Sequence, residues 1–483
     1  MQSTVNPKIV EFIDYYKAEI YRLPLDKALE QAEQLGLLLR ANEVGIYSLN
    51  ELETFLIDKF FSELSINYDV VDNSRHNKII FIATELYHTG GHTRLMERLA
   101  SFLDTRPDLL ITKKTIKSII KREEGFFSSI HHGCVDCCAV VEKVLFFLKV
   151  ILQYNIVILN THPEDIYAIV ACGLAKKIKE DIKIHFVNHA DHTFSYGSSI
   201  SDVWFEISGY GVAVDAMRGL KARKCFLGIP IDTSKQNSES SYKFENGDLI
   251  LSAASPNKYE PTNQHSIMPL VSALLDKYDK SNFQVIGVNF LTNYWWWAIK
   301  LKYWNRLKLS KSLPYEEYIK VTSSAKLYID SHPFPGGTAF AEQFLLGRLC
   351  VGLNSVYNGY TPLESFKKDS VDSVLREIEL INNKKIIDIK NEIEIKHGFT
   401  SVRVRFLDAI FKDVYAKEDF ILSFPKVKIL FEKIPVKIDQ ISKIRRISTK
   451  RAFCSSYIKK IIFNIFFGLR HCKFFKKNKL TAR

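Results

Sequence analysis

The sequence predicts an α/β protein with two doubly wound domains, each a parallel sheet covered by helices on both faces. At 483 residues the chain is too long for one hydrophobic core, since single cores seldom grow past roughly 250 residues. Its 46% hydrophobic and 25% charged residues are typical of a globular protein. Short apolar runs alternate with amphipathic helical runs along most of the chain, which is the pattern of parallel sheets.

The first 75 residues are expected to form a helical N-terminal extension, because their apolar residues recur with a helical period from Leu25 to Leu38 and from Leu52 to Leu64. No chemical motif stands out there. Residues 76–240 follow as the first α/β domain. Its expected strands are Ile79–Ala83, Ile156–Asn160, Ile184–Asn188, Val203–Ile207 and Lys224–Leu227.

A polar linker over residues 234–247 leads to the second α/β domain, residues 245–385. Its expected strands are Leu249–Ala253, Phe283–Gly287, Lys326–Asp330 and Leu349–Leu353, with helices near 267–278, 315–324 and 339–347. Two such domains would face a central cleft with the carboxyl ends of their strands, where open α/β sheets bind ligands. Residues 386–483 are expected to form a helical and basic tail.

Two glycine-rich elbows, each between an apolar run and a helical run, indicate a nucleotide held between two lobes. The first contains Gly90 and Gly91. The second contains Gly336, Gly337 and Thr338, with Glu342 one helical turn beyond. Glycines let backbone N–H groups approach an anion, and the following helix points its positive dipole end at the same place. A simple tight turn and a solvent-facing glutamate are the alternative interpretations.

Positive charge is concentrated in the tail. From Pro425 onward there are 17 Lys or Arg against two acids, a balance of +15, whereas the whole chain carries +13 and its remainder therefore −2. Aromatic and aliphatic residues lie between these cations, and residues 440–483 would suit an anionic membrane surface. A basic helix packed on the protein is the alternative. No nucleic-acid partner is expected, because no recognised binding motif accompanies the charge.

Four further features bear on the class of protein. The chain shows no signal peptide, so a cytoplasmic protein is expected. If residues 440–483 bind a membrane, the protein would lie peripherally on the inner face of that membrane. Eight scattered cysteines favour reduced thiols. The cluster His131–Cys138 lacks a second ligand pair for zinc, and no metal site is expected. Trp295–Trp297 is interpreted as core or interface packing, with sugar stacking as the alternative.

The order of these features, over residues 78 to 365, resembles the GT-B fold glycosyltransferases with two Rossmann-like domains, and in particular the retaining, sugar-nucleotide-dependent bacterial enzymes of the family 4-like, group 1 type. The resemblance rests on five local matches. These are Gly90-Gly91, Asn188-His189-Ala190-Asp191-His192, Gly228-Ile229-Pro230-Ile231-Asp232, Ser252 to Lys258, and Pro335-Gly336-Gly337-Thr338-Ala339-Phe340-Ala341-Glu342. The last is the most specific.

The resemblance implies roles for these residues. The glycine turn and Lys258 would contact the diphosphate of a nucleotide-sugar donor, and Glu342 would bind the ribose hydroxyls. His189 would face the donor sugar or act as a base, with His192 as the substitute candidate. The family's arginine shortly before the lysine and its second acid before the glutamate are missing here, so the resemblance does not fix retention or inversion.

The sequence therefore predicts a hexosyltransferase-like enzyme that moves a sugar from a nucleotide-sugar to a saccharide or glycolipid acceptor in capsule, O-antigen or lipopolysaccharide biosynthesis, without a cofactor or metal. A nucleotide-sugar-binding oxidoreductase is one rival, but it should show G-x-G-x-x-G. A non-enzymatic peripheral membrane adaptor is a second rival, and it would leave the second elbow unexplained. A nucleic-acid-binding protein is a third, and the salt dependence of its affinity would test it. The donor sugar, base, acceptor and oligomeric state are not specified by the sequence.

Overall fold

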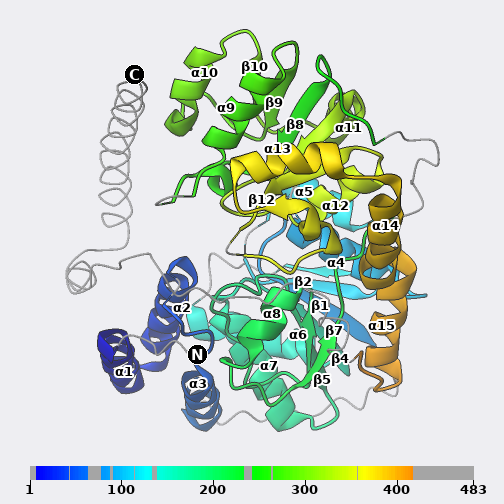
Figure 1. The fold of residues 1–483 in the computed structure, drawn as a ribbon. Helices are drawn as coiled ribbons and strands as arrows, with labels where there is room; N and C mark the ends of the chain where they lie inside the picture. Colours follow the sequence, from blue (N-terminus) through cyan, green and yellow to red (C-terminus); the bar gives the residue numbers. More distant parts are fainter. Residues whose placement is uncertain are drawn as a thin grey trace. The chain divides into compact units, whose positions relative to one another are not determined.

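The computed structural model describes residues 7–42, 44–63, 78–87, 91–113, 115–132, 139–232, 242–262, 265–355 and 357–416. These residues fall into two compact units (Figure 1). Unit 1 contains the described part of Met1–Ile231 and the segment from Glu394 onward. Unit 2 contains the described part of Asp232–Ile393. The basic tail, including residues 440–483, lies outside the described residues, as does most of the polar linker.

Unit 1 is built on a seven-stranded sheet in which every pairing is parallel and the strand order is β3-β2-β1-β4-β5-β6-β7. The strands are β1 Ile79–Ala83, β2 Asp108–Ile111, β3 Ile130–His131, β4 Ile156–Asn160, β5 Lys183–Asn188, β6 Val203–Glu206 and β7 Arg223–Phe226. β1 and β4 are buried at every position, because helices cover both faces of the sheet.

One face of this sheet carries a large core that includes the N-terminal helices. Side chains such as Ile80, Val157 and Trp204 pack there with residues of α1, α2, α3, α6 and α7. The opposite face meets α15, where Phe406 packs on Phe205. The helices of unit 1 are α1 Pro7–Arg22, α2 Leu25–Ala41, α3 Asn50–Glu63, α4 Gly91–Ser101, α5 Lys117–Glu123, α6 Val140–Ile151, α7 Ile166–Ile178, α8 Gly209–Asp215 and α15 Phe399–Phe411.

The first three helices are therefore part of the core of unit 1, whereas the first 75 residues were predicted to form a separate helical extension. Leu29, Leu52 and Phe60 are completely buried. The apolar face that gives these helices their sequence period is covered by α6 and α7. Periodicity shows that a helix has a buried face, but not which element covers it.

Unit 2 has a second parallel sheet of six strands in the order β10-β9-β8-β11-β12-β13. The strands are β8 Leu249–Ala253, β9 Asn282–Ile286, β10 Leu307–Ser310, β11 Ala325–Ile329, β12 Leu349–Leu353 and β13 Lys367–Lys368. The helices are η1 Pro256–Tyr259, α9 Met268–Lys277, η2 Tyr294–Trp296, α10 Trp297–Lys302, α11 Tyr315–Ser323, α12 Thr338–Leu345, η3 Pro362–Phe366 and α13 Val371–Leu380. α14 (Asn383–His397) begins in unit 2 and ends in unit 1.

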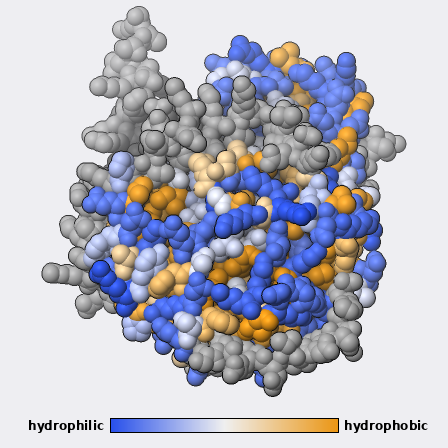
Figure 2. Space-filling view, turned by 90° about the horizontal axis from the view of Figure 1, so that it is seen from below, coloured by the Kyte–Doolittle hydropathy of each residue, from blue (hydrophilic) through white to orange (hydrophobic). Residues whose placement is uncertain are grey.

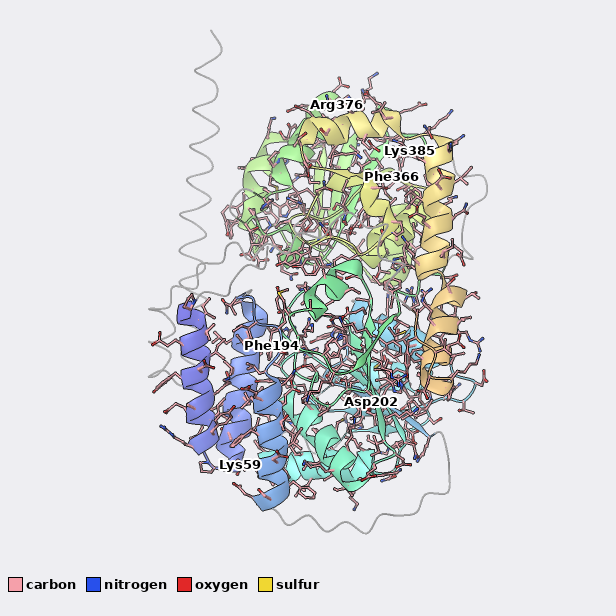
Figure 3. All side chains as sticks on the ribbon, turned by 60° about the horizontal axis from the view of Figure 1, so that its bottom comes forward. Lys59, Phe194, Asp202, Phe366, Arg376 and Lys385 are labelled. Carbon is pink, nitrogen blue, oxygen red and sulfur yellow. The ribbon has the colours of Figure 1, made fainter. Side chains whose placement is uncertain are left out.

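Side chains fill the space between sheet and helices in each unit, as around Phe194 in unit 1 and Phe366 in unit 2 (Figure 3). The face shown in Figure 2 mixes hydrophilic side chains with small groups of hydrophobic ones. Among the described residues, none of the helices combines the length and the apolar composition needed to cross a membrane. The described cysteines, Cys172, Cys225 and Cys350, are buried free thiols.

Candidate functional sites in the two units

Three histidines meet at the carboxyl ends of neighbouring strands in unit 1. His92 lies in the first turn of α4, His162 follows β4 and His189 follows β5. The ring centroid of His92 lies 4.3 Å from that of His189 and 5.5 Å from that of His162. The ring of Tyr87 stacks on His162 at 5.9 Å. His189 was predicted as a site residue, whereas His92, His162 and Tyr87 were not.

Burial keeps His92 and His189 neutral near pH 7. It lowers the pKa of His92 to about 4, and it lowers the pKa of His189 well below the ordinary value, with the neighbouring histidines adding to both shifts. Nε2 of His92 lies 2.9 Å from the carbonyl oxygen of Asn160, so this nitrogen carries the proton. Nδ1 of His92 and Nδ1 of His189 are buried with no hydrogen-bond partner in the described part of the chain. Nδ1 of His92 can therefore accept a hydrogen bond from a ligand.

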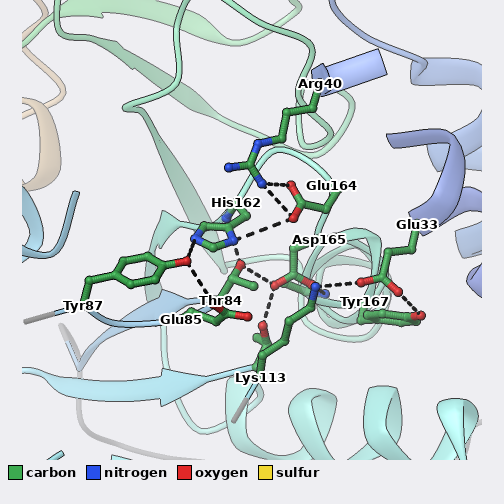
Figure 4. Close-up of polar contacts among 12 residues, drawn as sticks. Glu33, Arg40, Thr84, Glu85, Tyr87, Lys113, His162, Glu164, Asp165 and Tyr167 are labelled. Carbon is green, nitrogen blue, oxygen red and sulfur yellow. Dashed lines mark hydrogen bonds and ion pairs between the residues drawn. The ribbon is translucent and has the colours of Figure 1, made fainter. Parts of the chain in front are cut away.

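An ion pair between Arg40 and Glu164 lies next to His162 (Figure 4). Nη1 of Arg40 lies 2.9 and 2.7 Å from the two carboxylate oxygens of Glu164, and Oε1 of Glu164 lies 3.7 Å from Nδ1 of His162. Burial acts to raise the pKa of Glu164, but the hydrogen bond with His162 and the charge of Arg40 outweigh it and lower the pKa to about 2. The other ring nitrogen of His162 lies 3.4 Å from the hydroxyl of Tyr87.

Asp165 joins the same strand ends next to His162 (Figure 4). Its Oδ2 accepts hydrogen bonds from the hydroxyls of Thr84, at 2.6 Å, and Thr112. Its Oδ1 caps α7 by accepting from the amide of Ala168 at 3.2 Å. The hydroxyl of Thr84 in turn accepts from the amide of His162 at 2.8 Å. Asp165 thus ties the loops after β1, β2 and β4 to one another and fixes the backbone of His162.

The other predicted residues of unit 1 are placed differently. His192 is partly exposed, and its Nδ1 lies 3.5 Å from Oδ1 of Asp191. The buried guanidinium of Arg218 donates to the carbonyl of Asp191 at 2.9 Å and so fixes this loop. Gly91 begins α4, and a Cβ added to it would meet nothing within 4 Å in the described structure. Gly90 lies outside the described residues.

The second elbow lies at the carboxyl end of β11 in unit 2 and is organised by Asp330. Oδ1 of this buried carboxylate accepts from the amide of Ser331 at 2.9 Å and from the amide of Gly336 at 2.8 Å. Its Oδ2 pairs with Nζ of Lys367 at 2.7 Å. Burial alone would lower the pKa of Lys367, but Asp330 and Glu364 raise it above the ordinary value.

This arrangement assigns different roles to the two predicted glycines. The amide of Gly336 is used by Asp330, and a Cβ at Gly336 would lie 2.4 Å from Oδ1 of Asp330. Gly336 therefore holds the elbow together. Gly337 adopts φ +57° at the start of α12, a conformation that favours glycine. Within the described structure no side chain caps α12, so its first amides face outward from an uncapped helix start.

Lys258 lies against the same elbow. Its Nζ donates to the carbonyl oxygen of Pro335 at 2.6 Å, and burial lowers its pKa. Glu342 is half-buried on α12, one turn beyond Thr338, which places both side chains on the same face of the helix. The structure thus gathers Lys258, the elbow and the first turn of α12 at one edge of the sheet.

His332 is a further buried group of this elbow. Its side chain is 4% exposed, and its Nδ1 has no hydrogen-bond partner in the described structure. Burial lowers the pKa of His332 to about 3. Asp330 and His332 were not predicted as site residues, although Asp330 is the last residue of an expected strand and His332 lies two positions beyond it, where ligand-binding side chains of parallel sheets gather. Lys367, 37 positions beyond Asp330, carries no comparable sequence signal.

The described residues contain no group of three or more His, Cys, Asp or Glu side chains arranged to hold a metal ion. Most of the His131–Cys138 cluster lies outside the described residues. Of the three tryptophans at 295–297, Trp296 is fully buried and packs on Tyr259, with ring centroids 5.5 Å apart, whereas Trp297 is 44% exposed.

Comparison with known proteins shows the fold. No protein-family model matches the chain, and no curated protein matches it in sequence. Its structure is similar to that of HepE from Anabaena, solved with UDP-glucose, with a TM-score of 0.51 and 11% identity over 69% of this chain and 99% of HepE. It is also similar to a glycosyltransferase from Rickettsia africae, with a TM-score of 0.52 and 11% identity over 70% of this chain and all of that one. The predicted GT-B fold with two Rossmann-like domains is confirmed.

Proposed function

We propose that the chain is a glycosyltransferase that moves a sugar from a nucleotide-sugar to a saccharide or lipid-linked saccharide acceptor. The observation that carries the proposal is the elbow of unit 2, where Lys258, the uncapped start of α12 and Glu342 lie on one sheet edge. Anabaena HepE has the same fold and was solved with UDP-glucose, which supports a nucleotide-sugar as the donor.

The chemistry required is stabilisation of a departing nucleoside diphosphate. Backbone amides at the start of α12 and its positive dipole end would bind the phosphates, and the ammonium of Lys258 would add a full positive charge. Lys258 would then exchange the carbonyl of Pro335 for a phosphate oxygen. The carboxylate of Glu342 would accept two hydrogen bonds from the ribose hydroxyls. Gly336 would act indirectly, because Asp330 already uses its amide.

Unit 1 supplies neutral hydrogen-bonding groups. With its pKa lowered by burial, His189 would contact a sugar hydroxyl as a neutral ring, and it would act as a base only after gaining access to water or to an acceptor hydroxyl. His92 offers Nδ1 as an acceptor beside it. His192 is proposed as a secondary contact, because it is partly exposed and not part of the ring cluster.

In the cell, we propose that the protein acts in surface polysaccharide or glycolipid synthesis, on the cytoplasmic side and without a metal. This proposal follows from the class of reaction and from the basic residues at 440–483, which lie outside the described residues. Deleting residues 440–483 should lower membrane partition in a cell fractionation, and an unchanged distribution would remove the support from the tail.

Thermal-shift titration of the full chain with nucleoside diphosphates and nucleotide-sugars tests the donor proposal. A ligand at 100 times its dissociation constant should stabilise the protein by about 2.7 kcal/mol. Glu342→Gln should weaken the response to the true donor, whereas Glu379→Gln, at an exposed position of α13, is the matched control and should leave it unchanged. A flat response to every nucleotide would count against a transferase and in favour of an adaptor.

A further inference from the structure

Four large apolar side chains of unit 2 are exposed within one short segment that contains η2 and α10. Figure 1 labels α10. These side chains are Leu291, Trp297, Leu301 and Trp304, with 78%, 44%, 66% and 59% of their surface exposed. We call this group the α10 surface. Exposed apolar groups that gather in one segment, unlike scattered ones, mark a surface that binds something.

The core does not require these residues. Other side chains of this segment, Trp296, Ile299 and Tyr303, are buried in the core of unit 2. Trp297 and Leu301 are spaced four apart, so they share the outer face of α10. Shortening the exposed side chains should therefore leave the core of unit 2 intact.

The exposed indoles are held in place. Nε1 of Trp297 donates to the carbonyl of Phe290 at 2.6 Å, which ties this ring to the loop that carries Leu291. The ring of Trp304 lies under Nζ of Lys300, 4.7 Å from the ring centroid. Fixed aromatic side chains lose little conformational entropy on binding.

The same segment is strongly basic. Residues 287–314 contain five cations and no Asp or Glu, and the cations are Lys300, Lys302, Arg306, Lys308 and Lys311. Lys302 has an acidic partner from outside the segment, Asp276, at 2.9 Å. Lys308 and Lys311 are exposed. Lys300 and Arg306 donate to backbone carbonyls, such as those of Leu307 at 2.7 Å and Leu275 at 2.9 Å.

We propose that the α10 surface binds an anionic lipid bilayer. Indole rings with one polar atom suit the headgroup region, leucine side chains reach the acyl boundary, and lysines near the surface are attracted to anionic headgroups. A second copy of the chain is disfavoured as the occupant, because it would bring five further cations against these five. The proposal stands apart from the transferase proposal, since it concerns neither elbow, and it does not involve residues 440–483.

Vesicle co-sedimentation of the full chain tests whether the exposed apolar side chains of the α10 surface contribute to membrane binding. Phosphatidylcholine vesicles with and without phosphatidylglycerol are compared for the wild type and for Leu301→Ser/Trp304→Ser. The double variant should lower the partition coefficient on anionic vesicles about tenfold or more. The matched control is Leu380→Ser/Ile387→Ser, which removes side chains that are 62% and 56% exposed elsewhere, and it should leave partition unchanged.

A charge variant tests the lipid specificity. Lys308→Gln/Lys311→Gln should lower partition about fivefold to tenfold per lysine on anionic vesicles at low salt, with no effect on vesicles of phosphatidylcholine alone. Brominated lipids should quench tryptophan fluorescence in the wild type, and Trp304→Phe should remove part of that quenching. Because this readout reports the position of the indole itself, membrane binding by the tail would not produce it.

Two outcomes would overturn the proposal. The first is unchanged partition and unchanged quenching in the Leu301→Ser/Trp304→Ser variant, provided that circular dichroism shows wild-type folding. The second is a wild-type dimer, seen by sedimentation velocity without vesicles, that the same variant converts to a monomer. That result would assign the α10 surface to self-association.

Discussion

The polar centres of the two units are organised in different ways. In unit 1, Arg40 on α2 reaches Glu164, which is 124 positions later in the chain, and through it holds His162. In unit 2, the elbow is held by Asp330, only six positions before Gly336. One centre is assembled from remote segments, whereas the other is mainly a local turn to which remote side chains such as Lys258 and Lys367 are added.

Their electrostatics also differ. His92 and His189 in the ring cluster of unit 1 are neutral, because burial lowers the pKa of each below neutrality. The elbow of unit 2 keeps buried charges, with Lys367 paired to Asp330 and the ammonium of Lys258 on the backbone of the turn. A neutral centre suits hydroxyl groups, and a centre with a buried cation suits an anion such as a diphosphate. The comparison can be tested by removing each organising group in turn.

The largest effect is expected at Lys367. Replacing it in Lys367→Met leaves the carboxylate of Asp330 buried and without its cation, and unfolding free energy should fall by about 3–5 kcal/mol. Urea denaturation followed by circular dichroism measures this. Lys326→Met, at an exposed position of β11, is the control and should change stability by less than about 0.5 kcal/mol.

The double variant Asp330→Asn/Lys367→Met sharpens this test. It should recover part of the unfolding free energy lost in Lys367→Met, because the carboxylate of Asp330 is removed together with its cation. Equal losses in the single and the double variant would show that the methionine disrupts packing, and that the ion pair does not organise the elbow.

Much of the fold was predictable from apolar runs. The expected strands at 79–83, 156–160, 249–253 and 349–353 coincide with β1, β4, β8 and β12, because central parallel strands are buried on both faces and therefore apolar throughout. β2, β3, β10 and β13 were not predicted. They have two to four residues each and lie towards the sheet edges, where the apolar run is too short to distinguish from a loop.

The site was predictable only where it is local. The elbow with Gly336, Gly337 and Thr338 follows a strand and starts a helix, so its chemistry could be inferred from one stretch of sequence. The contribution of Arg40 could not, because nothing in α2 indicates which loop it will reach. Pairings across more than a hundred positions depend on tertiary packing, which local patterns do not encode.

The pH dependence of stability should separate Glu164 from His92. The pKa of Glu164 is about 2 in the folded chain against an ordinary 4.5, so its contribution is complete above pH 4.5 and is lost as the pH falls towards 2. The pKa of His92 is about 4 against an ordinary 6.5, so the folded state binds fewer protons, and stability falls as the pH drops from 6.5 to 4. Each contribution is at most about 3 kcal/mol.

Urea denaturation at stepped pH measures these contributions. Glu164→Gln should make the profile less steep below pH 4.5, and His92→Gln should make it less steep between pH 6.5 and 4. Some slope should remain in the second window, because burial also lowers the pKa of His189 and of His332. The control Glu63→Gln removes an exposed carboxylate on α3 and should leave both windows unchanged. A His92→Gln profile as steep as that of the wild type would show that His92 does not contribute in this window.

A smaller effect is expected at Gly337. Its φ of +57° is unfavourable for a residue with a Cβ, so Gly337→Ala should cost about 1–2 kcal/mol. The added strain would act on the start of α12, and nucleotide binding should weaken in the thermal-shift titration as well. Ala339→Gly, two positions along in the first turn of the same helix, is a useful control because it alters the helix without requiring a positive φ. Stability unchanged in Gly337→Ala would show that the turn relaxes easily.

The smallest effect on stability is expected at Gly91, the counterpart of Gly337 in unit 1. A Cβ there meets nothing within 4 Å in the described structure, and Gly91 begins a helix, so Gly91→Ala should change stability by less than about 0.5 kcal/mol, in the stabilising direction. Under the transferase proposal, the open space is occupied by a ligand, and the same variant should weaken nucleotide-sugar binding. Reduced binding with unchanged stability would therefore place a ligand at the first elbow. Unchanged binding would show that Gly91 serves only to begin the helix, and ligand binding in unit 1 would then be assigned to the histidine cluster.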